Sequence, residues 1–361
     1  MPAASSKSSG LQSALRSHEF ILLVVVVSEW IFFYFAGTSK NFHGQTVGFG
    51  TLDAQLDILR HSCEIGLLAL VMTPIILTGG IDLSVGSVLG FSAIVFGKLW
   101  RDGHCPIPVA IAGALVVGAA AGALNASLIT RLRLPPLIVT LGTYSLFRGL
   151  AEAITHGADT FTGFPPSFNF LGNGRWPSFG PADNPTWQGL PTQGYIFIVV
   201  AIAVWLLVHR TTFGRSFRAI GYAPEGARYA GLPVERRLAL AYILAGTVAA
   251  LAGVIFAARL GQAKADLGTG YELFAITAVV LGGTSIFGGS GTVHGTLLGV
   301  AAVAILTDGL SLAHWPREVG GMLTGLLLIL ALTDSVLPKI LSNRRSRVQT
   351  PPPSPQPNPT T

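Results

Sequence analysis

Long apolar runs alternate with short polar segments along nearly the whole chain. Each run can cross about 30 Å of hydrocarbon as a helix. The runs begin at ten positions: Phe20, Cys63, Val85, Ile107, Leu137, Tyr195, Leu238, Leu273, Val293 and Val319. Since only helices and closed barrels span a bilayer, this pattern predicts an all-α polytopic membrane protein with about ten transmembrane helices over residues 19–341.

The two ends of the chain are polar. Residues 1–18 are rich in serine, and residues 342–361 pass from a basic segment into a proline-rich tail. Such segments bury too little apolar surface to fold, so we expect both to be disordered. The apolar run behind the N-terminal segment contains Glu29, which suits a retained first span better than a cleaved signal peptide.

Composition and charge set the class and the orientation. Half of the 361 residues are hydrophobic and only 11% are charged, which excludes a water-soluble domain of this size. If the spans alternate from a cytosolic N-terminus, most of the 23 Lys and Arg residues fall on the cytosolic side. We therefore expect a multi-pass inner (plasma) membrane protein with both termini in the cytosol. The net charge of +6 follows from this asymmetry and indicates no nucleic-acid partner.

A short helix is predicted inside the most polar stretch between two apolar runs, Arg210–Arg237. Pro224 suits the first helical position, Gly231 can adopt the left-handed cap, and Pro233 prevents continuation. The helix is therefore about two turns long and bounded at both ends. A membrane protein with such a helix in a loop can dock a partner there, whereas the alternative is an ordinary cytosolic connector.

The proposed docking face of this helix is built from small residues. Ala223, Ala227 and Ala230 fall on one face at helical spacing, which would let another protein approach the backbone closely. The residues assigned to coupling with a partner are Ala223, Pro224, Glu225, Gly226, Ala227, Arg228, Gly231 and Leu232.

A short signature occurs once in each half of the chain. Asp82-Leu83-Ser84-Val85-Gly86, followed after two residues by Leu89, matches the segment Asp266-Leu267-Gly268-Thr269-Gly270, followed after two residues by Leu273. The predicted topology places the first copy near the inner side and the second near the outer side. This favours inverted repeats, as in many transporters, with chance similarity as the alternative.

The chain around the first copy predicts a discontinuous helix. The preceding span is expected to break at Pro74 and then at Gly79 and Gly80, and Asp82 or Ser84 can cap the next helix. Irregular backbone at membrane depth is tolerated where protein or a watery cavity covers it. We therefore assign these residues to the translocation path: Gly79, Gly80, Asp82, Ser84, Gly86, Asp266 and Gly270.

Five ionisable residues lie inside apolar runs: Glu29, Glu64, Arg148, Glu152 and Asp308. Such groups are costly in lipid and are functional candidates by default. Arg148 and Glu152 are four residues apart and can neutralise each other. The carboxylates leave open a proton- or sodium-coupled secondary carrier. An intramembrane enzyme is disfavoured because no metal-ligand spacing and no nucleophile with an evident base is found, and we expect no metal or cofactor.

Four segments, in order, resemble permease subunits of ribose- and xylose-type sugar ABC importers. They are LTGGIDLSVGSVLG (77–90), GALNASLITRLRLPPLIVTLGT (122–143), GRSFRAIGYAPEGARYAGLP (214–233) and YELFAITAVVLGGTSIFGGSGTVHGTLLG (271–299). The resemblance implies a type II importer fold with inverted repeats. It also implies a second permease subunit (the same chain or a paralogue), a cytosolic ABC ATPase subunit and a periplasmic sugar-binding protein.

The same resemblance places the family's coupling segment on residues 223–232. Ala223 stands where relatives commonly have Asn, and Gly226 and Ala230 also depart from the usual residues. The substrate implied is a monosaccharide of the pentose, hexose or deoxyhexose class, although permeases for amino acids or nucleosides share the architecture. The sequence contains no G-x-x-x-x-G-K-S/T phosphate loop, so ATP hydrolysis is expected in a separate subunit and this chain is not itself an enzyme.

Overall fold

The computed structural model describes residues 18–40, 46–177, 179 and 189–348. The helices are α2 (His18–Ala36), α3 (Leu52–Leu77), α4 (Val85–Arg101), α5 (Ile107–Thr130), α6 (Pro136–Ile154), α7 (Pro166–Asn173), α8 (Thr192–Arg210), α9 (Thr212–Tyr222), α10 (Pro224–Tyr229), α11 (Val234–Leu260), α12 (Tyr271–Leu281), α13 (Val293–Leu312) and α14 (Arg317–Val348). Three short antiparallel pairs join β1 (Thr38–Lys40) to β2 (Thr46–Gly48), β3 (Phe161–Thr162) to β6 (Gln262–Ala263), and β4 (Arg175–Trp176) to β5 (Leu190–Pro191).

Each of the ten predicted apolar runs forms a helix, which confirms the all-α polytopic class. Within the described ranges, seven helices are long and apolar enough to cross a membrane: α2, α3, α5, α6, α8, α11 and α13. The helix α12 is shorter, with 11 residues. Conversely, α3 begins at Leu52, well before the predicted start, because the Thr51 hydroxyl oxygen accepts a hydrogen bond from the Ala54 N–H at 3.3 Å.

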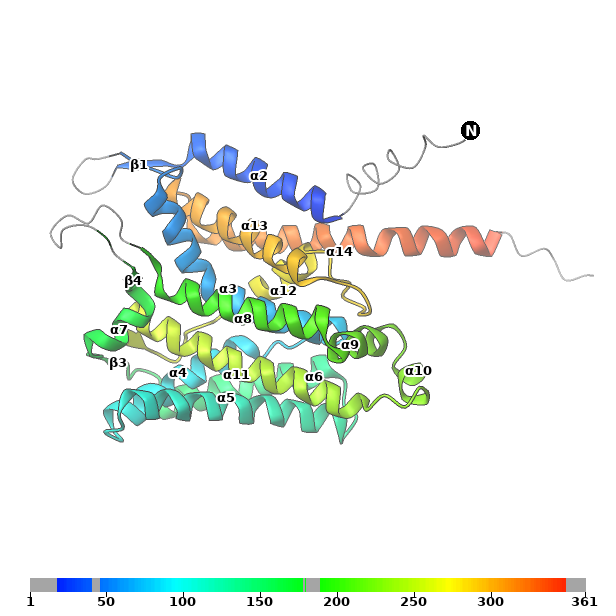
Figure 1. Ribbon diagram of the computed structural model, residues 1–361, viewed down its shortest axis with the longest axis horizontal. Helices are drawn as coiled ribbons and strands as arrows, with labels where there is room; N and C mark the ends of the chain where they lie inside the picture. The colour runs from blue at the N-terminus through cyan, green and yellow to red at the C-terminus, as the bar shows by residue number, and fades with distance from the viewer. Residues whose placement is uncertain (1–17, 41–45, 178, 180–188, 349–361) are drawn as a thin grey trace, which may run out of the picture.

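The helices run roughly along one direction, with the strands at one end and α9 and α10 at the other (Figure 1). We call these the strand end and the α10 end. The helix α11 packs on α5, and glycines make this contact close: a Cβ on Gly246 would meet the backbone of Gly118, and one on Gly122 would meet that of Tyr242. Small residues allow this approach of backbones in membrane helices.

The C-terminal boundary differs from the sequence prediction. The helix α14 runs to Val348, so residues 342–348, which were expected to be disordered, are helical. It extends beyond the rest of the bundle at the α10 end (Figure 1). The other residues for which disorder was predicted, 1–17 and 349–361, lie outside the described residues, and His18 begins α2.

The break between α3 and α4 lies at residues 78–84. The prediction that the helix breaks at Pro74 was wrong, because Pro74 lies inside α3 and the helix continues to Leu77. Gly79 has a φ of +80°, so the reversal occurs at a residue that tolerates this conformation. Ser84 occupies the cap position of α4 without a capping side-chain bond. Asp82 accepts hydrogen bonds from the Ser84 N–H at 2.8 Å and from its hydroxyl at 2.6 Å.

Candidate functional site

The predicted short helix forms as α10, with Pro224 at its first position and Gly231 at a φ of +77°. Of the predicted alanine face, Ala230 is exposed and Ala223 is half-buried, but the central Ala227 faces the bundle. Ala227 is only 5% exposed, because it packs against Ile220 of α9 and Val234 of α11. The helix is therefore attached to the bundle through Ala227.

Two exposed tyrosines that sequence reasoning missed lie here, Tyr222 at the end of α9 and Tyr229 at the end of α10. Tyr222 is 88% exposed and Tyr229 is 90% exposed, and Glu225 lies exposed between them. We call the exposed residues Tyr222, Pro224, Glu225, Gly226 and Tyr229 the α10 surface. Tyrosines just before and near the end of the predicted short helix were the signal that could have found this surface.

Arg228 fastens α10 to the following helix. Its guanidinium lies 3.1 Å from the Glu225 carboxylate and 3.0 Å from that of Glu235, which belongs to the first turn of α11. The side chains that were expected to flank a docking face are thus paired with each other within the chain. Together with the burial of Ala227, this pairing connects α10 to α9 and α11.

The end of α9 meets the end of α3 through a segment that we call the glycine loop, residues 282–292. The Gly289 N–H donates to the Leu77 carbonyl at 2.9 Å. A Cβ on Gly221 would collide with the same carbonyl oxygen, and one on Gly288 would meet the backbone of Gly79 and Gly221. Backbone packs on backbone here, so the segment before α10 directly touches the segment where α3 breaks.

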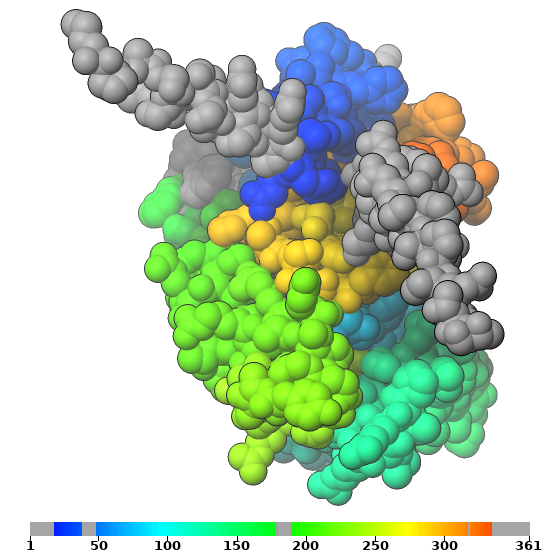
Figure 2. Space-filling view, turned by 90° about the vertical axis from the view of Figure 1, so that its right-hand side faces the viewer, coloured from blue at the N-terminus to red at the C-terminus, as the bar shows by residue number. Residues whose placement is uncertain are grey.

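The N-terminal helix holds the other side of the glycine loop. His18 Nε2 lies 2.8 Å from the Leu281 carbonyl oxygen, and the Thr292 hydroxyl donates to Glu19 at 2.6 Å. Figure 2 views the α10 end, where the yellow-orange glycine loop lies between the start of α2 in blue and α9–α10 in green. The loop is thus held from both sides.

The first signature copy is built into a buried polar network. Asp82 is 2% exposed and Ser84 is fully buried. The Asn125 amide of α5 donates to the Ser84 hydroxyl at 2.8 Å, and the Thr143 hydroxyl of α6 donates to Asn125 at 2.7 Å. The network satisfies these polar groups and fixes the start of α4 against α5 and α6.

The two signature copies lie against each other. A Cβ on Gly86 would meet the Gly268 carbonyl oxygen at 2.6 Å and would collide with the Glu272 carboxylate. Gly268 and Gly270 have φ values of +72° and +84°, which shape the turn into α12. The Gly270 N–H also donates to Glu272 at 3.2 Å. The signature thus marks the point where α4 and α12 begin side by side.

Arg148 of α6 holds the chain that leads into α12. Its guanidinium donates to the Ala265 carbonyl and, at 3.0 Å, to the Leu267 carbonyl. The expected neutralisation by Glu152 does not occur, since Glu152 is exposed and the arginine is directed to this backbone instead. Backbone carbonyls outside a helix lack an intrahelical N–H partner, so they can accept hydrogen bonds from a cationic side chain within the membrane.

A cleft of about 710 Å³ opens between α3, α11, α12, α13 and the start of α14. Asp266, Gly268 and Thr269 of the second signature copy line it. The other residues assigned to the path, Gly79, Gly80, Asp82, Ser84, Gly86 and Gly270, are not in its lining. We call it the α12 cleft.

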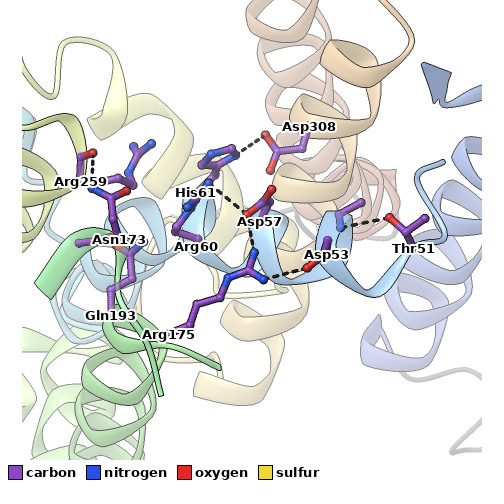
Figure 3. A network of polar contacts seen from close by, with 12 residues as sticks. Thr51, Asp53, Asp57, Arg60, His61, Asn173, Arg175, Gln193, Arg259 and Asp308 are labelled. Carbon is purple, nitrogen blue, oxygen red and sulfur yellow. Dashed lines mark hydrogen bonds and ion pairs between the residues drawn. The ribbon is translucent and has the colours of Figure 1, made fainter. Parts of the chain in front are cut away.

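Ion pairs surround the α12 cleft and continue to the strand end (Figure 3). Arg259 Nε lies 2.8 Å from the buried Glu64 carboxylate, and His61 Nδ1 lies 3.4 Å from Asp308 Oδ1. Arg175 of β4 contacts Asp53 at 2.8 Å and Asp57 at 3.3 Å, both on the first turns of α3. Glu64 and Asp308, which the sequence offered as ion-coupling sites, therefore each have a partner.

Comparison with known proteins agrees with this architecture. Residues 55–332 match a family model described as the permease component of branched-chain amino acid transport systems. The Autoinducer 2 import system permease protein LsrD of Yersinia enterocolitica serotype O:8 is 42% identical over 269 residues, which is 74% of this chain and 79% of that protein. LsrD of Escherichia coli O9:H4 is 38% identical over 296 residues, or 80% of this chain and 87% of that protein.

No solved structure matches the chain. The family match covers most of the sequence, and the two relatives are import permeases, which confirms the resemblance to importer permease subunits. The chain therefore belongs to this family of transport-system permease components, as a multi-pass membrane protein whose part is transport.

Proposed function

We propose that the chain is the transmembrane permease subunit of an ATP-driven importer for a sugar-like small molecule of the monosaccharide class. The similarity to permeases named for autoinducer 2 import and the four motifs of the sugar-importer type support this class. A periplasmic binding protein delivers the ligand at the strand end. A cytosolic ABC ATPase acts at the α10 end, and a second permease subunit completes the pathway.

The observation that carries the proposal is the backbone contact between the α9–α10 segment and the end of α3. An ATPase bound to the α10 surface moves α10 as a rigid unit, because Ala227 and Arg228 attach it to α9 and α11. The displacement reaches Leu77 through Gly289 and Gly221. From there it acts on the break that precedes α4.

The path residues then have two roles. Asp82 and Ser84 fix the start of α4 against α5 and α6, and Gly86 packs against the start of α12, while Asp266 lines the α12 cleft. Gly79, Gly80 and Gly270 lie in the turns that precede α4 and α12, and at these turns the two helices can tilt. A shift of α4 relative to α12 opens a route from the cleft toward the α10 end.

The test removes the two exposed tyrosines of the α10 surface and leaves the packing of α10 against α9 and α11 unchanged. The variant Y222A/Y229A is reconstituted into proteoliposomes with the ATPase and binding protein of the same transport system. Each tyrosine is nearly fully exposed, so folding is unchanged, whereas loss of two aromatic contacts lowers ATP-dependent uptake and substrate-stimulated ATPase activity by about tenfold or more. Phe35→Ala on α2, 77% exposed, is the matched control and retains wild-type uptake.

Two results would reject the proposal. If Y222A/Y229A takes up the ligand at the wild-type rate, α10 does not couple the ATPase to transport. Uptake by the wild-type chain that needs no ATP and is abolished by a protonophore would instead favour the ion-coupled carrier.

A further inference from the structure

The α12 cleft has the dimensions of a small-molecule site, because protein sites for such ligands enclose roughly 300–1,000 Å³ and this cleft measures about 710 Å³. Polar and charged side chains line it together with aromatic and aliphatic ones. Its lining includes the second signature copy, which contacts Gly86 at the start of α4. A ligand in the cleft would therefore rest on the segment proposed to move during transport.

The cations of the cleft are already engaged by carboxylates of the chain. Arg259 pairs with Glu64 at 2.8 Å, and Lys264 Nζ lies 3.3 Å from Asp266 Oδ2. Every Arg and Lys whose side chain is described in the cleft lining is thus paired. An amino acid or another carboxylate ligand needs a cation that can exchange its present partner for the ligand. If Arg259 paired with the ligand, Glu64 would be left buried without its partner.

The remaining lining suits a ring with hydroxyl groups. Tyr271, which is half-buried and stacks on the buried Phe256, lines the cleft together with Trp315, which is 57% exposed just before α14. Aromatic faces pack against the apolar C–H faces of a sugar ring. The hydroxyls of Thr269 and Ser311 also line the cleft and can donate or accept hydrogen bonds.

Asp308 supplies an acceptor that the described part of the chain does not satisfy. Its Oδ1 has one contact, with His61 at 3.4 Å, and its Oδ2 is buried with no hydrogen-bond partner among the described residues. A buried carboxylate oxygen without a partner is costly. A hydroxyl of a ligand in the cleft can donate to this carboxylate after a small side-chain rotation.

We infer that the α12 cleft is a selective subsite of the permease itself, which accepts neutral polyhydroxylated ligands such as monosaccharides and rejects amino acids. The inference rests on the proposed function and adds that selection does not depend on the binding protein alone. Asp308 accepts hydroxyls and Trp315 packs on the ring.

The test measures binding to the purified permease–ATPase complex without the binding protein. Equilibrium dialysis uses radiolabelled D-ribose, D-xylose and D-glucose, with L-leucine as the amino acid probe. At least one sugar binds in a saturable manner and L-leucine does not displace it. Asp308→Asn and Trp315→Ala each weaken sugar binding by about tenfold, which corresponds to about 1.4 kcal/mol. Glu152→Gln, a carboxylate change at an exposed position of α6, leaves sugar binding unchanged.

The outcomes separate this inference from the proposed function. If the wild-type complex imports its ligand with ATP but none of the sugars binds the permease, or the variants bind as the wild type does, the subsite is refuted and the importer stands. Displacement by L-leucine also refutes it. Trp315→Phe keeps a ring and restores most of the binding if stacking is the cause, whereas a folding defect in Trp315→Ala would show as a lower melting temperature.

Discussion

Replacing Arg259 with methionine is expected to destabilise the protein strongly, and far more than replacing the exposed Arg228 with methionine. Glu64 lies near the middle of α3 and is fully buried, and its described partner is the Arg259 guanidinium at 2.8 Å. Arg259→Met removes the cation and leaves the carboxylate in the low-dielectric interior. Breaking a buried pair from one side in this way costs about 3–5 kcal/mol.

The double variant E64L/R259M provides the decisive comparison. It removes both charges and fills the space with apolar atoms, so its stability is expected to return to within about 1 kcal/mol of the wild type or to exceed it. Unfolding by SDS in mixed micelles, followed by circular dichroism, measures the differences. Arg228→Met is the matched control: its pair with Glu225 has side chains 37% and 71% exposed, so the loss is about 0–1 kcal/mol.

Either of two results would contradict this expectation. Arg259→Met could prove no more destabilising than Arg228→Met, which would mean that Glu64 is not buried in a medium of low dielectric constant. Alternatively, E64L/R259M could remain as unstable as the single variant, which would mean that Glu64 and Arg259 stabilise the protein by more than the neutralisation of each other's charge.

Two further predictions concern packing and pH. Gly246→Leu places a side chain into the backbone of Gly118 and is expected to lower the melting temperature and the monodisperse fraction in size-exclusion chromatography. Gly142→Leu, on a glycine with no atoms near its Cβ position, is expected to leave both unchanged. Arg101 holds the pKa of Asp159 below its ordinary value of 3.8, so their ion pair stabilises the strand end above about pH 4 and is lost as the pH falls through the lowered pKa. Hydrogen-exchange protection factors of the loop after α6, which are corrected for the slower intrinsic exchange at low pH, should therefore fall from pH 5 to pH 3 in the wild type and change less in Arg101→Gln. Equal protection profiles would contradict this account.

The helices of this protein could be predicted from the sequence because long apolar runs admit few alternatives in a bilayer. The position and the limits of α10 were also predictable, since Pro224 and Gly231 act through local backbone geometry. The side of α10 that faces outward was not. Helical spacing identifies which residues share a face, but the location of the bundle decides which face is covered, and α9 and α11 cover Ala227.

Long-range partners explain the other errors. Spacing along α6 suggested a pair between Arg148 and Glu152, but Arg148 reaches carbonyls of the segment before α12, more than a hundred residues away. Pro74 was expected to break α3, yet proline is tolerated inside membrane helices when neighbouring groups compensate for the lost hydrogen bond. The repeated signature was visible in the sequence, but the contact between Gly86 and Gly268 depends on how the helices pack.

The contact between Leu77, Gly221 and Gly288 has a consequence for how the chain tolerates change. Three segments of main chain meet there without a side chain between them, so a single methyl group at Gly221 or Gly288 must displace a neighbour. A saturation scan of a growth-coupled library would therefore show a narrow band of intolerance at these glycines, where even alanine is rejected.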